Sequence, residues 1–421
     1  MTPARSILIV SQLTPPATFS AGRRIAGLAK YLDRIGHRVT VLTSLASGRG
    51  PLKGARVLRT RDLIVSSANW RRRNFETMRT GGDAYYEPAP SRVASYVVPD
   101  LSLVGWLPFA VPRALRLAHQ ERVDCVITSS PPESGHLAGL VLHGRGVPWI
   151  ADLRDGWIFE TTHPDWAHPA LRRIDCELER AVLRRADLVT AVTEPITEDL
   201  HERLGVRAAT LPNGFDPEEQ VAAAARDVGV LPGRHSLVHT GRMGFAGRSP
   251  RPLLAALRLL RERRPDAARR LEVVFAGPLS REERDVLGDM ELDGMVRTMG
   301  ALPRKETLGL QRAADGLLLL TGRSRRSEAT AKLYEYLATG HPILVLGEET
   351  TAARIVSEAG AGVVTSAEDP NKICEALVEL LDRPPADASP PAGVERYSYR
   401  QLAQELEGLV ERAIGTARPA R

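Results

Sequence analysis

The stretch from Ser6-Ile-Leu-Ile-Val-Ser11 to Arg38-Val-Thr-Val-Leu-Thr43 decides the fold. Both ends of it are short apolar runs between polar or turn residues, which is typical of buried strands. Between them, residues 21–35 repeat apolar side chains at helical spacing, and Gly36 supplies a stop. A strand, a helix and a strand in such close succession predict a βαβ unit, and therefore a parallel sheet.

The same alternation continues along the chain. In the first half, the pattern predicts further strands at 123–128, 148–152 and 188–192, with helices around 136–142 and at 171–185. In the second half, it predicts strands at 237–240, 272–276, 317–320 and 342–346, with helices at 251–263 and 331–339. The chain is therefore expected to be an α/β protein made of two doubly wound, Rossmann-like domains.

The domain boundaries follow from breaks in this pattern. We expect an N-terminal domain over residues 1–216 and a C-terminal domain over 236–395. Residues 217–235 carry several Pro, Gly and Ala residues, which suits a linker. Residues 396–421 are predicted to form a helix that packs back toward the N-terminal domain. Two such domains predict a ligand cleft at the carboxyl ends of both sheets.

Composition narrows the class of protein. The 421 residues carry 57 Lys and Arg against 51 Asp and Glu, a net charge of +6, with only 5% aromatic residues. This modest excess, interleaved with acids, argues against nucleic-acid binding, and Arg71-Arg-Arg73 fits a solvated loop within 66–92 better than a nucleic-acid patch. The basic balance suits an anionic ligand or an acceptor close to a membrane.

The cysteines and the apolar runs carry two further expectations. Cys125, Cys176 and Cys374 are far apart and lack the paired spacing of a zinc or redox site, so they are expected to be structural thiols. No apolar run approaches the roughly 18–20 residues that span a bilayer, and the N-terminus leads directly into a strand. These features predict a soluble cytoplasmic protein.

The segment Lys332-Leu-Tyr-Glu-Tyr-Leu-Ala-Thr-Gly340 carries the strongest chemical signal. Lys332 falls in the first turn of a predicted helix, where an ammonium and free backbone amides can both face an anion. Glu335 lies three residues further on the same face, and its carboxylate could accept hydrogen bonds from a ribose diol. An ordinary amphipathic helix with an i,i+3 ion pair explains the spacing equally well.

A glycine-rich loop follows the first strand of the second half. In Thr240-Gly-Arg-Met-Gly-Phe-Ala-Gly-Arg-Ser-Pro250, the glycines allow the backbone to approach a ligand. Arg242 and Arg248 can fork onto phosphate oxygens. The alternative is a flexible turn with solvated arginines. The sequence lacks a phosphate-binding P-loop, a Gly-x-Gly-x-x-Gly motif, a metal-binding Asp-x-Asp pair and a His-Glu-x-x-His motif.

Two segments of the first half also follow strands and are expected on the cleft side. They are Thr128-Ser-Ser-Pro-Pro-Glu-Ser-Gly-His136 and Asp152-Leu-Arg-Asp-Gly-Trp157. His136 is a candidate catalytic residue, although a lone histidine is more often structural. Arg154 can form a structural ion pair with Asp152 or Asp155.

Together these segments resemble the retaining, family-4-like GT-B glycosyltransferases, in particular a bacterial subgroup with a Lys-Leu-Tyr-Glu-Tyr-Leu-Ala-x-Gly signature. Each segment is short, but their order and spacing make the resemblance specific. The matching segments are Gly105–Ala110, Ser129–Leu137, Pro148–Asp155, Leu211–Asp216, Gly241–Pro250, Phe275–Gly277 and Lys332–Pro342.

The resemblance implies a donor site in the C-terminal domain for a nucleoside-diphosphate sugar, with no metal at the diphosphate and no tightly bound cofactor. Arg242 and Lys332 would neutralise the diphosphate and count as catalytic, and Glu335 would hold the ribose. The remaining implied donor contacts are Gly241, Arg248, Leu333 and Glu328. A Glu335→Ala change is expected to weaken nucleotide binding without unfolding the chain.

The resemblance places the acceptor in the N-terminal domain, near Ser20, Gly22, His136 and the turn formed by Asp152, Arg154 and Asp155. The chain departs from relatives in two details. Glu328 lacks the usual Gly-Phe-Gly context of a sugar-binding glutamate, and Arg248 follows Arg242 by six positions, where relatives have five.

Three rival functions stay open. A nucleotide-sugar epimerase or a pseudo-glycosyltransferase would share the fold and the donor site. A peripheral membrane or anionic-ligand binding protein would use Leu101 to Arg116, where Trp106, Phe109, Arg113 and Arg116 could touch a bilayer. A buried core helix is the competing interpretation of that stretch.

Overall fold

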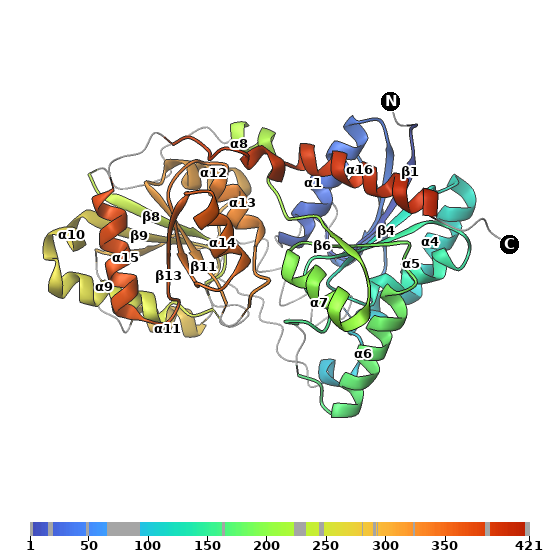
Figure 1. Cartoon of the computed structure of the whole chain (residues 1–421), viewed down its shortest axis with the longest axis horizontal. Coiled ribbons are helices and arrows are strands. Elements are labelled where there is room, and N and C mark those ends of the chain that lie inside the picture. The colour runs from blue at the N-terminus through green and yellow to red at the C-terminus, as the bar shows by residue number, and fades with distance from the viewer. Residues whose placement is uncertain are drawn as a thin grey trace. The chain divides into compact units, whose positions relative to one another are not determined.

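A computed structural model describes residues 3–15, 20–47, 50–64, 93–161, 165–222, 233–243, 248–279, 281–288, 292, 294–322, 325–383 and 388–416. The chain divides into two compact domains (Figure 1). The described residues up to Gly214, together with Tyr397–Thr416, form the N-terminal domain, and those from Phe215 to Arg396 form the C-terminal domain.

The N-terminal domain is built on a parallel sheet with strand order β3-β2-β1-β4-β5-β6-β7. Its strands are β1 (Ser6–Val10), β2 (Arg38–Ser44), β3 (Arg56–Thr60), β4 (Cys125–Ser130), β5 (Trp149–Leu153), β6 (Leu188–Ala191) and β7 (Ala208–Thr210). Its helices are α1 (Ser20–Arg34), α3 (Ser102–Gly105), α4 (Leu107–Glu121), α5 (Gly135–His143), α6 (Pro169–Leu183), α7 (Glu194–Leu204) and α16 (Tyr399–Thr416), with short 3₁₀ turns at Leu45–Ser47 and Ala94–Tyr96.

The C-terminal domain repeats the design with strand order β10-β9-β8-β11-β12-β13, again parallel. Its strands are β8 (His235–Thr240), β9 (Leu271–Ala276), β10 (Val296–Thr298), β11 (Gly316–Leu320), β12 (Ile343–Leu346) and β13 (Gly362–Thr365). Its helices are α8 (Pro217–Ala222), α9 (Arg251–Arg263), α10 (Pro265–Arg270), α11 (Arg281–Gly288), α12 (Arg304–Ala313), α13 (Ala331–Leu337), α14 (Thr351–Glu358) and α15 (Pro370–Asp382), and a 3₁₀ turn spans Val394–Tyr397.

Each sheet has one point where the strand order reverses direction. In the N-terminal domain it lies between β1 and β4, and in the C-terminal domain between β8 and β11. At such a switch point the loops from the two neighbouring strands leave toward opposite faces of the sheet, so a ligand can enter between them. The two switch points are therefore where binding chemistry is expected in this fold.

The C-terminal helix α16 belongs to the N-terminal domain and lies beside α1 (Figure 1). Tyr399 and Leu402 share a core cluster with Ile25 and Leu28 of α1. Gly27 of α1 is needed for this packing, because a Cβ there would stand 2.2 Å from the Tyr399 ring. The apolar face of the helix that follows residue 397 thus explains why the chain returns to its first domain.

The strands and helices predicted from the sequence are present, within a few residues at each end. One difference concerns residues 217–235, which were expected to be a linker. Pro217–Ala222 form helix α8, whose first turn carries Glu218 and Glu219, as favours a helix N-terminus. Among the described residues, no helix is long and apolar enough to cross a membrane.

Candidate functional site

Glycines shape the loop that leaves β8 at the second switch point. Gly241 has φ of +95°, which L side chains rarely adopt, and its N–H donates to the Ala276 carbonyl at 2.7 Å. A Cβ on Gly277 would stand 2.1 Å from the Gly241 carbonyl oxygen. The two glycines therefore let the chain segments that follow the parallel strands β8 and β9 approach each other closely. Residues 244–247 of the loop after β8 lie outside the described residues.

Lys332 of α13 brings a partly exposed ammonium to this loop. A Cβ on Gly241 would stand 3.3 Å from Lys332 Nζ, so a larger residue there would crowd the ammonium. Lys332 Nζ also lies 3.3 Å from Nε2 of His239, a residue of β8. The structure thus brings together Gly241 and Lys332 at the carboxyl end of β8, and Arg242 follows directly in the chain.

His239 anchors this corner of the C-terminal domain. Its side chain is fully buried, with Nδ1 2.9 Å from the Leu318 carbonyl oxygen and Nε2 3.0 Å from that of Arg242. Burial, and then the nearby charge of Lys332, lower the pKa of His239 to about 3. His239 is therefore neutral and carries a single N–H, so it can donate to only one of these two carbonyls. With that proton on Nδ1 and donated to Leu318, Nε2 can accept from the Lys332 ammonium.

Glu335 lies in a more enclosed place than the sequence suggested. It is only 1% exposed, its Oε1 is 2.9 Å from Arg304 Nη1, and Gln311 Nε2 donates to Oε2 at 3.3 Å. Burial works against the charge of Arg304, but Glu335 and then Glu219 outweigh it and raise the pKa of Arg304. Removing the carboxylate would leave Arg304 short of a partner, so we expect Glu335→Ala to lower the stability of the domain as well. That this variant stays folded and binds nucleotide more weakly remains a prediction.

A hydrogen-bond network links α13 and α12 to the end of β8. The Tyr336 hydroxyl accepts from the Thr240 N–H at 2.9 Å, and Gln311 Nε2 donates to Thr240 Oγ1 at 2.9 Å. Burial raises the pKa of Tyr336 to about 12. Leu333 is fully buried and fills the domain core. This network fixes the direction in which α13 presents Lys332.

Arg248 and Glu328, both implied donor contacts, meet each other in the structure. Arg248 Nε donates to Glu328 Oε1 at 2.8 Å, and Nη2 contacts the same oxygen. The second carboxylate oxygen accepts the Gly322 N–H at 2.5 Å. Both side chains are less than 10% exposed. The pair joins the loops after β8 and β11 across the switch point. A contact of Arg248 with the diphosphate and of Glu328 with the sugar stays a prediction.

Asp152, at the end of β5, forms a buried ion pair in the N-terminal domain. Its partner is Arg24 of α1, at 2.8 Å, and Ser129 and Thr190 each donate to the carboxylate at 2.9 Å. Burial alone would raise the pKa of Asp152, but Arg24 and the hydrogen bonds lower it. Arg24 also donates to the Leu211 carbonyl. This role is structural, and an acceptor contact by Asp152 stays a prediction.

Arg154 has a different partner from the one the sequence suggested. Its Nε donates to the Ser130 carbonyl at 2.8 Å, and Nη2 donates to that of Pro131. Burial lowers the pKa of this guanidinium. Arg154 therefore fixes the loop after β4, and Asp155 next to it is partly exposed.

Gly22, another implied acceptor residue, lies at the first switch point. It lies in the first turn of α1, close to the chain that leaves β1, since a Cβ there would stand 2.9 Å from Pro15. The backbone of Ser20 starts the same helix, and its side chain lies outside the described residues. A bulkier residue than Gly22 would push α1 away from the loop after β1.

His136 lies in the first turn of α5 and is fully buried. Its Nδ1 is 2.8 Å from Thr128 Oγ1, and its ring stacks on Trp157 at 5.9 Å between centroids. Its Nε2 is buried without a hydrogen-bond partner among the described residues. Burial lowers the pKa of His136 to about 4, although Asp152 acts in the other direction.

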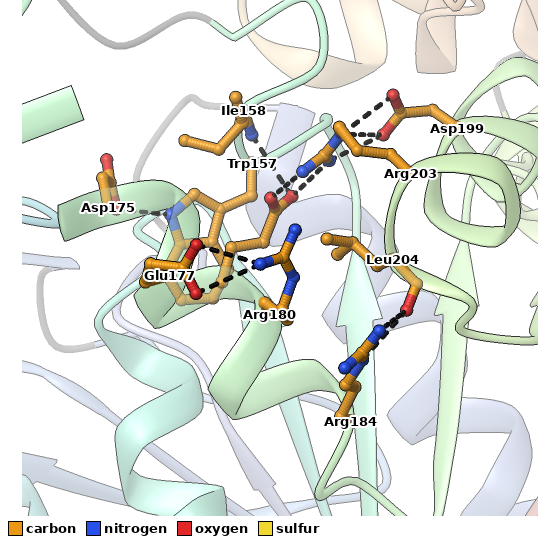
Figure 2. Close-up of polar contacts among 10 residues, drawn as sticks. Trp157, Ile158, Asp175, Glu177, Arg180, Arg184, Asp199, Arg203 and Leu204 are labelled. Carbon is orange, nitrogen blue, oxygen red and sulfur yellow. Dashed lines mark hydrogen bonds and ion pairs between the residues drawn. The ribbon is translucent and has the colours of Figure 1, made fainter. Parts of the chain in front are cut away.

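A polar network on α6 and α7 holds Trp157 in place (Figure 2). The Trp157 indole N–H donates to Asp175 at 2.9 Å, and Trp166 donates to the other oxygen of that carboxylate at 3.0 Å. Nearby, buried Glu179 accepts the Ile158 N–H, and Arg203 of α7 bridges Glu179 and Asp199. These contacts hold the loop after β5 against helices α6 and α7, and they thereby fix the position of the Trp157 ring that stacks on His136.

Sequence reasoning missed three residues near these sites. Glu133, three residues before His136, is 8% exposed, and burial, then Asp100, raise its pKa well above the ordinary range. Arg24 and Gln311 complete the buried networks of Asp152 and Glu335. Glu133 was visible inside a quoted motif, and Arg24 precedes Ile25 on a buried helix face, which could have marked both.

The burial of Trp106 argues against a membrane-binding surface over the whole stretch from Leu101 to Arg116. Trp106 is fully buried and donates its indole N–H to Thr60 at 2.9 Å, so it belongs to the core. Phe109, Arg113 and Arg116 line a surface hollow of about 350 Å³ together with Arg61. This hollow can take an anionic group, and membrane contact stays a prediction.

Part of the chain matches the model of a known protein family. Residues 20–214 match the glycosyl transferase 4-like domain. No curated protein matches the sequence significantly. Among the described residues, no group of three or more His, Cys, Asp or Glu side chains could hold a metal ion.

Similar solved structures cover nearly the whole chain. Sucrose-phosphate synthase from Thermosynechococcus elongatus has 16% identity and a TM-score of 0.69, covering 98% of this chain and 99% of its own. Trehalose 6-phosphate synthase from Burkholderia multivorans has 14% identity and a TM-score of 0.66, covering 99% and 100%. A putative UDP-N-acetylglucosamine 2-epimerase from Listeria monocytogenes has 14% identity and a TM-score of 0.56, covering 99% and 98%. The predicted two-domain α/β GT-B fold is confirmed.

Proposed function

We propose that the protein is a glycosyltransferase that moves a sugar from a nucleoside-diphosphate sugar to an acceptor hydroxyl or amine. The observation that carries the proposal is the cradle at the carboxyl end of β8, where Lys332 Nζ lies against Gly241, which has positive φ. The ammonium can neutralise phosphate oxygens, and the glycine lets a ligand come close to the backbone. At a switch point, this combination suits the binding of a diphosphate. The glycosyl transferase 4-like match over residues 20–214 supports the same reaction.

In this proposal Lys332 and Arg242 bind the diphosphate, and they stabilise the charge that develops on it as the glycosidic bond breaks. Because two cations supply this charge, the transfer needs no metal at the diphosphate. Gly241 gives the phosphate oxygens access to the backbone. Glu335 binds the ribose, with Arg304 and Gln311 fixing the orientation of its carboxylate.

The acceptor binds the N-terminal domain beside Gly22 and the loops that follow β4 and β5. His136 contributes a neutral imidazole there, because its pKa near 4 keeps it uncharged at neutral pH. We propose retention of anomeric configuration through an oxocarbenium-like transition state, in which the departing diphosphate is the main charge to stabilise. In this proposal the protein is cytoplasmic, and its acceptor is either soluble or membrane-bound.

A thermal-shift screen against UDP, GDP, TDP, ADP and their common sugars tests the donor site. A ligand at 100 times its dissociation constant stabilises the folded state by about 2.7 kcal/mol. We expect one nucleoside diphosphate to raise the melting temperature of the wild type and not of a Lys332→Met variant. A folded protein that responds to none of them would overturn the proposal.

Product analysis then separates the transferase from its closest rival. The likeness to a putative UDP-N-acetylglucosamine 2-epimerase keeps an epimerase in view. An epimerase would convert the identified nucleotide sugar without an acceptor, whereas a transferase releases nucleoside diphosphate in proportion to acceptor. The anomeric proton coupling of the product, read by NMR, tests retention.

A further inference from the structure

Three side chains of the N-terminal domain form a hydrogen-bonded chain that ends at His136. The Trp149 indole N–H, at the start of β5, lies 2.8 Å from Thr128 Oγ1 of β4. Thr128 Oγ1 in turn lies 2.8 Å from His136 Nδ1. All three residues are fully buried. Water therefore does not compete for these contacts, and their donors and acceptors can be counted.

The direction of the chain follows from donor chemistry. An indole N–H can only donate, so Trp149 takes one lone pair of the Thr128 oxygen. If the hydroxyl proton of Thr128 points to His136 Nδ1, every group is satisfied except one N–H on Nε2. If Nδ1 carried the proton instead, both the Thr128 hydroxyl proton and His136 Nε2 would be left unpaired. The first arrangement leaves one unpaired buried group, the second two, and each such group is costly.

The local packing is built to allow this chain. A Cβ on Gly139 of α5 would stand 2.1 Å from Trp149 Nε1, so glycine is required for the indole to reach Thr128. In the sheet, Thr128 pairs with Ala151 and Val126 pairs with Trp149, which puts Trp149 one pleat away from Thr128 on the same face. Trp157, whose indole N–H donates to Asp175, stacks on the His136 imidazole.

We propose that Thr128 and Trp149 are positioning residues that hold the His136 proton on Nε2, so that His136 donates a hydrogen bond to a sugar hydroxyl oxygen of the substrate. This role in catalysis rests on the proposed glycosyl transfer, whereas the position of the proton does not. It assigns His136 as a hydrogen-bond donor in the reaction, and not as the base that deprotonates the acceptor.

The charges around the ring agree with a neutral donor. Burial is the largest cause that lowers the pKa of His136 to about 4; of the nearby charges, Asp152 raises the pKa and Arg154 lowers it. Asp152 is already bound by Arg24, which limits its attraction for a proton on the imidazole. At neutral pH the ring therefore carries one proton, and the hydrogen-bonded chain decides which nitrogen holds it.

Nitrogen-15 NMR of histidine-labelled full-length protein tests the assignment directly, with a His136→Gln variant to identify the signals. We expect a protonated Nε2 and an unprotonated Nδ1 shifted by an accepted hydrogen bond. In Thr128→Val, the Nδ1 signal should move to the position of a nitrogen that accepts none, and Thr128→Ser should restore it. A wild-type proton on Nδ1, or an unchanged Nδ1 signal in Thr128→Val, would overturn the proposal.

A matched pair of tryptophan variants adds a control. Trp106 donates to Thr60 in the same domain, as Trp149 donates to Thr128, but its bond is not part of the chain to His136. Trp149→Phe should shift the His136 signals partway toward those of Thr128→Val, and Trp106→Phe should leave them unchanged. Equal shifts in both variants would mean a general packing effect and would count against the chain. The wild-type spectrum decides the proton position even if Thr128→Val does not fold.

Kinetics then test the link to catalysis. With the donor identified by the thermal-shift screen, Thr128→Val should lower kcat/KM by about tenfold, the scale of one neutral hydrogen bond, and Thr128→Ser should recover most of it. The wild-type kcat should show no titration near the ordinary histidine pKa. If no nucleotide sugar is turned over, the proposed function fails while the NMR result still stands. Normal kinetics in a Thr128→Val variant with a moved Nδ1 signal would refute the catalytic role alone.

Discussion

The switch points of the two domains both contain a buried histidine, but the groups around the two histidines differ. At the first, fully buried His136 has a pKa lowered to about 4 and lies near the buried Asp152–Arg24 pair. At the second, fully buried His239 has a pKa lowered to about 3 and contacts Lys332. His239 has partners at both ring nitrogens and holds a cation in place. His136 keeps one buried nitrogen without a partner among the described residues.

The difference indicates a division of labour. The C-terminal switch point presents positive charge through Lys332, which suits an anionic donor group. The N-terminal switch point presents a neutral imidazole, while its arginines, Arg24 and Arg154, are committed to Asp152 and to backbone carbonyls. A site with its cations committed in this way suits an uncharged hydroxyl better than a phosphate. Variants that exchange or remove these features can break the comparison.

The largest effect is expected from breaking the acid–arginine pairs. Arg24 and Asp152 are 0% and 5% exposed, so Asp152→Ala should destabilise the N-terminal domain by about 3–5 kcal/mol. Arg304 is 30% exposed and keeps Glu219, so Glu335→Ala should cost the C-terminal domain less, about 2–3 kcal/mol. Urea unfolding followed by tryptophan fluorescence and by circular dichroism measures both.

Among the described residues, all tryptophans belong to the N-terminal domain, so fluorescence follows that domain; they are Trp106, Trp149, Trp157 and Trp166. Asp152→Ala should move the fluorescence transition, and Glu335→Ala should move only the transition seen by circular dichroism. A larger loss for Glu335→Ala than for Asp152→Ala would contradict the ranking of the two pairs by burial.

Removing the cation at the second switch point comes next. Lys332→Met keeps the length and the apolar stem of the side chain but not its charge. We expect kcat/KM to fall about 10²–10³-fold, as for loss of one group that stabilises the transition-state charge. The Lys372→Met variant is the control, because Lys372 pairs with Glu348 on the surface at 3.6 Å. A Lys332→Met enzyme as active as Lys372→Met would remove the diphosphate assignment.

The two histidines make stability depend on pH in a predictable direction. The folded pKa of His136, about 4, lies below its ordinary value of 6.5, so the unfolded chain binds the proton more readily. Its stabilising contribution is complete above pH 6.5 and is lost as the pH falls toward 4. Between pH 7 and pH 5 this contribution of His136 should fall by about 2 kcal/mol, and the raised pKa of Glu133 acts in the opposite direction.

Fluorescence-monitored unfolding at several pH values measures this slope. His136→Gln should flatten it, whereas His239→Gln should leave the fluorescence slope unchanged, because His239 lies in the other domain. Asp152 adds a loss only below its ordinary pKa of 3.8, since its folded pKa is lowered. A slope of equal size in His136→Gln would show that the imidazole is not buried as a neutral group.

The sequence predicted the fold well because its signals are local. Apolar runs such as Leu237 to Thr240 and the helix at 251–263 need only neighbouring residues to be recognised. The sequence also placed the candidate loops at the carboxyl ends of strands, but it did not predict the strand order that sets the two switch points. The helix over Pro217–Ala222 was missed, because proline and alanine are common both in linkers and in first helical turns.

The partners of the predicted site residues were not predictable in the same way. Glu335 meets Arg304 across 31 positions of sequence, and Asp152 meets Arg24 across a separation of 128. Such pairs depend on how helices α12 and α1 pack on the sheets, which no local pattern records. The structure shows these expected ligand residues in buried ion pairs, which their local sequence did not indicate, and beside Gly241 it leaves the charged residues Lys332 and Arg242 partly exposed.

The smallest effect on nucleotide affinity should come from the Arg248–Glu328 pair, and it tests how far the second switch point extends. If the pair only joins two loops, Arg248→Ala and Glu328→Gln should each destabilise the C-terminal domain at least as much as Glu335→Ala, because both side chains are less than 10% exposed, with a coupling of about 1 kcal/mol or more in a double-mutant cycle. Nucleotide affinity should then change by less than about threefold, a free-energy change of roughly 0.6 kcal/mol. Isothermal titration of both single variants and the double variant measures this. A larger loss of affinity in both single variants, without a further loss in the double variant, would instead place the intact pair against the donor. In that case the charged surface of this switch point would reach beyond Lys332 to the loop after β11, and its contrast with the neutral N-terminal switch point would widen.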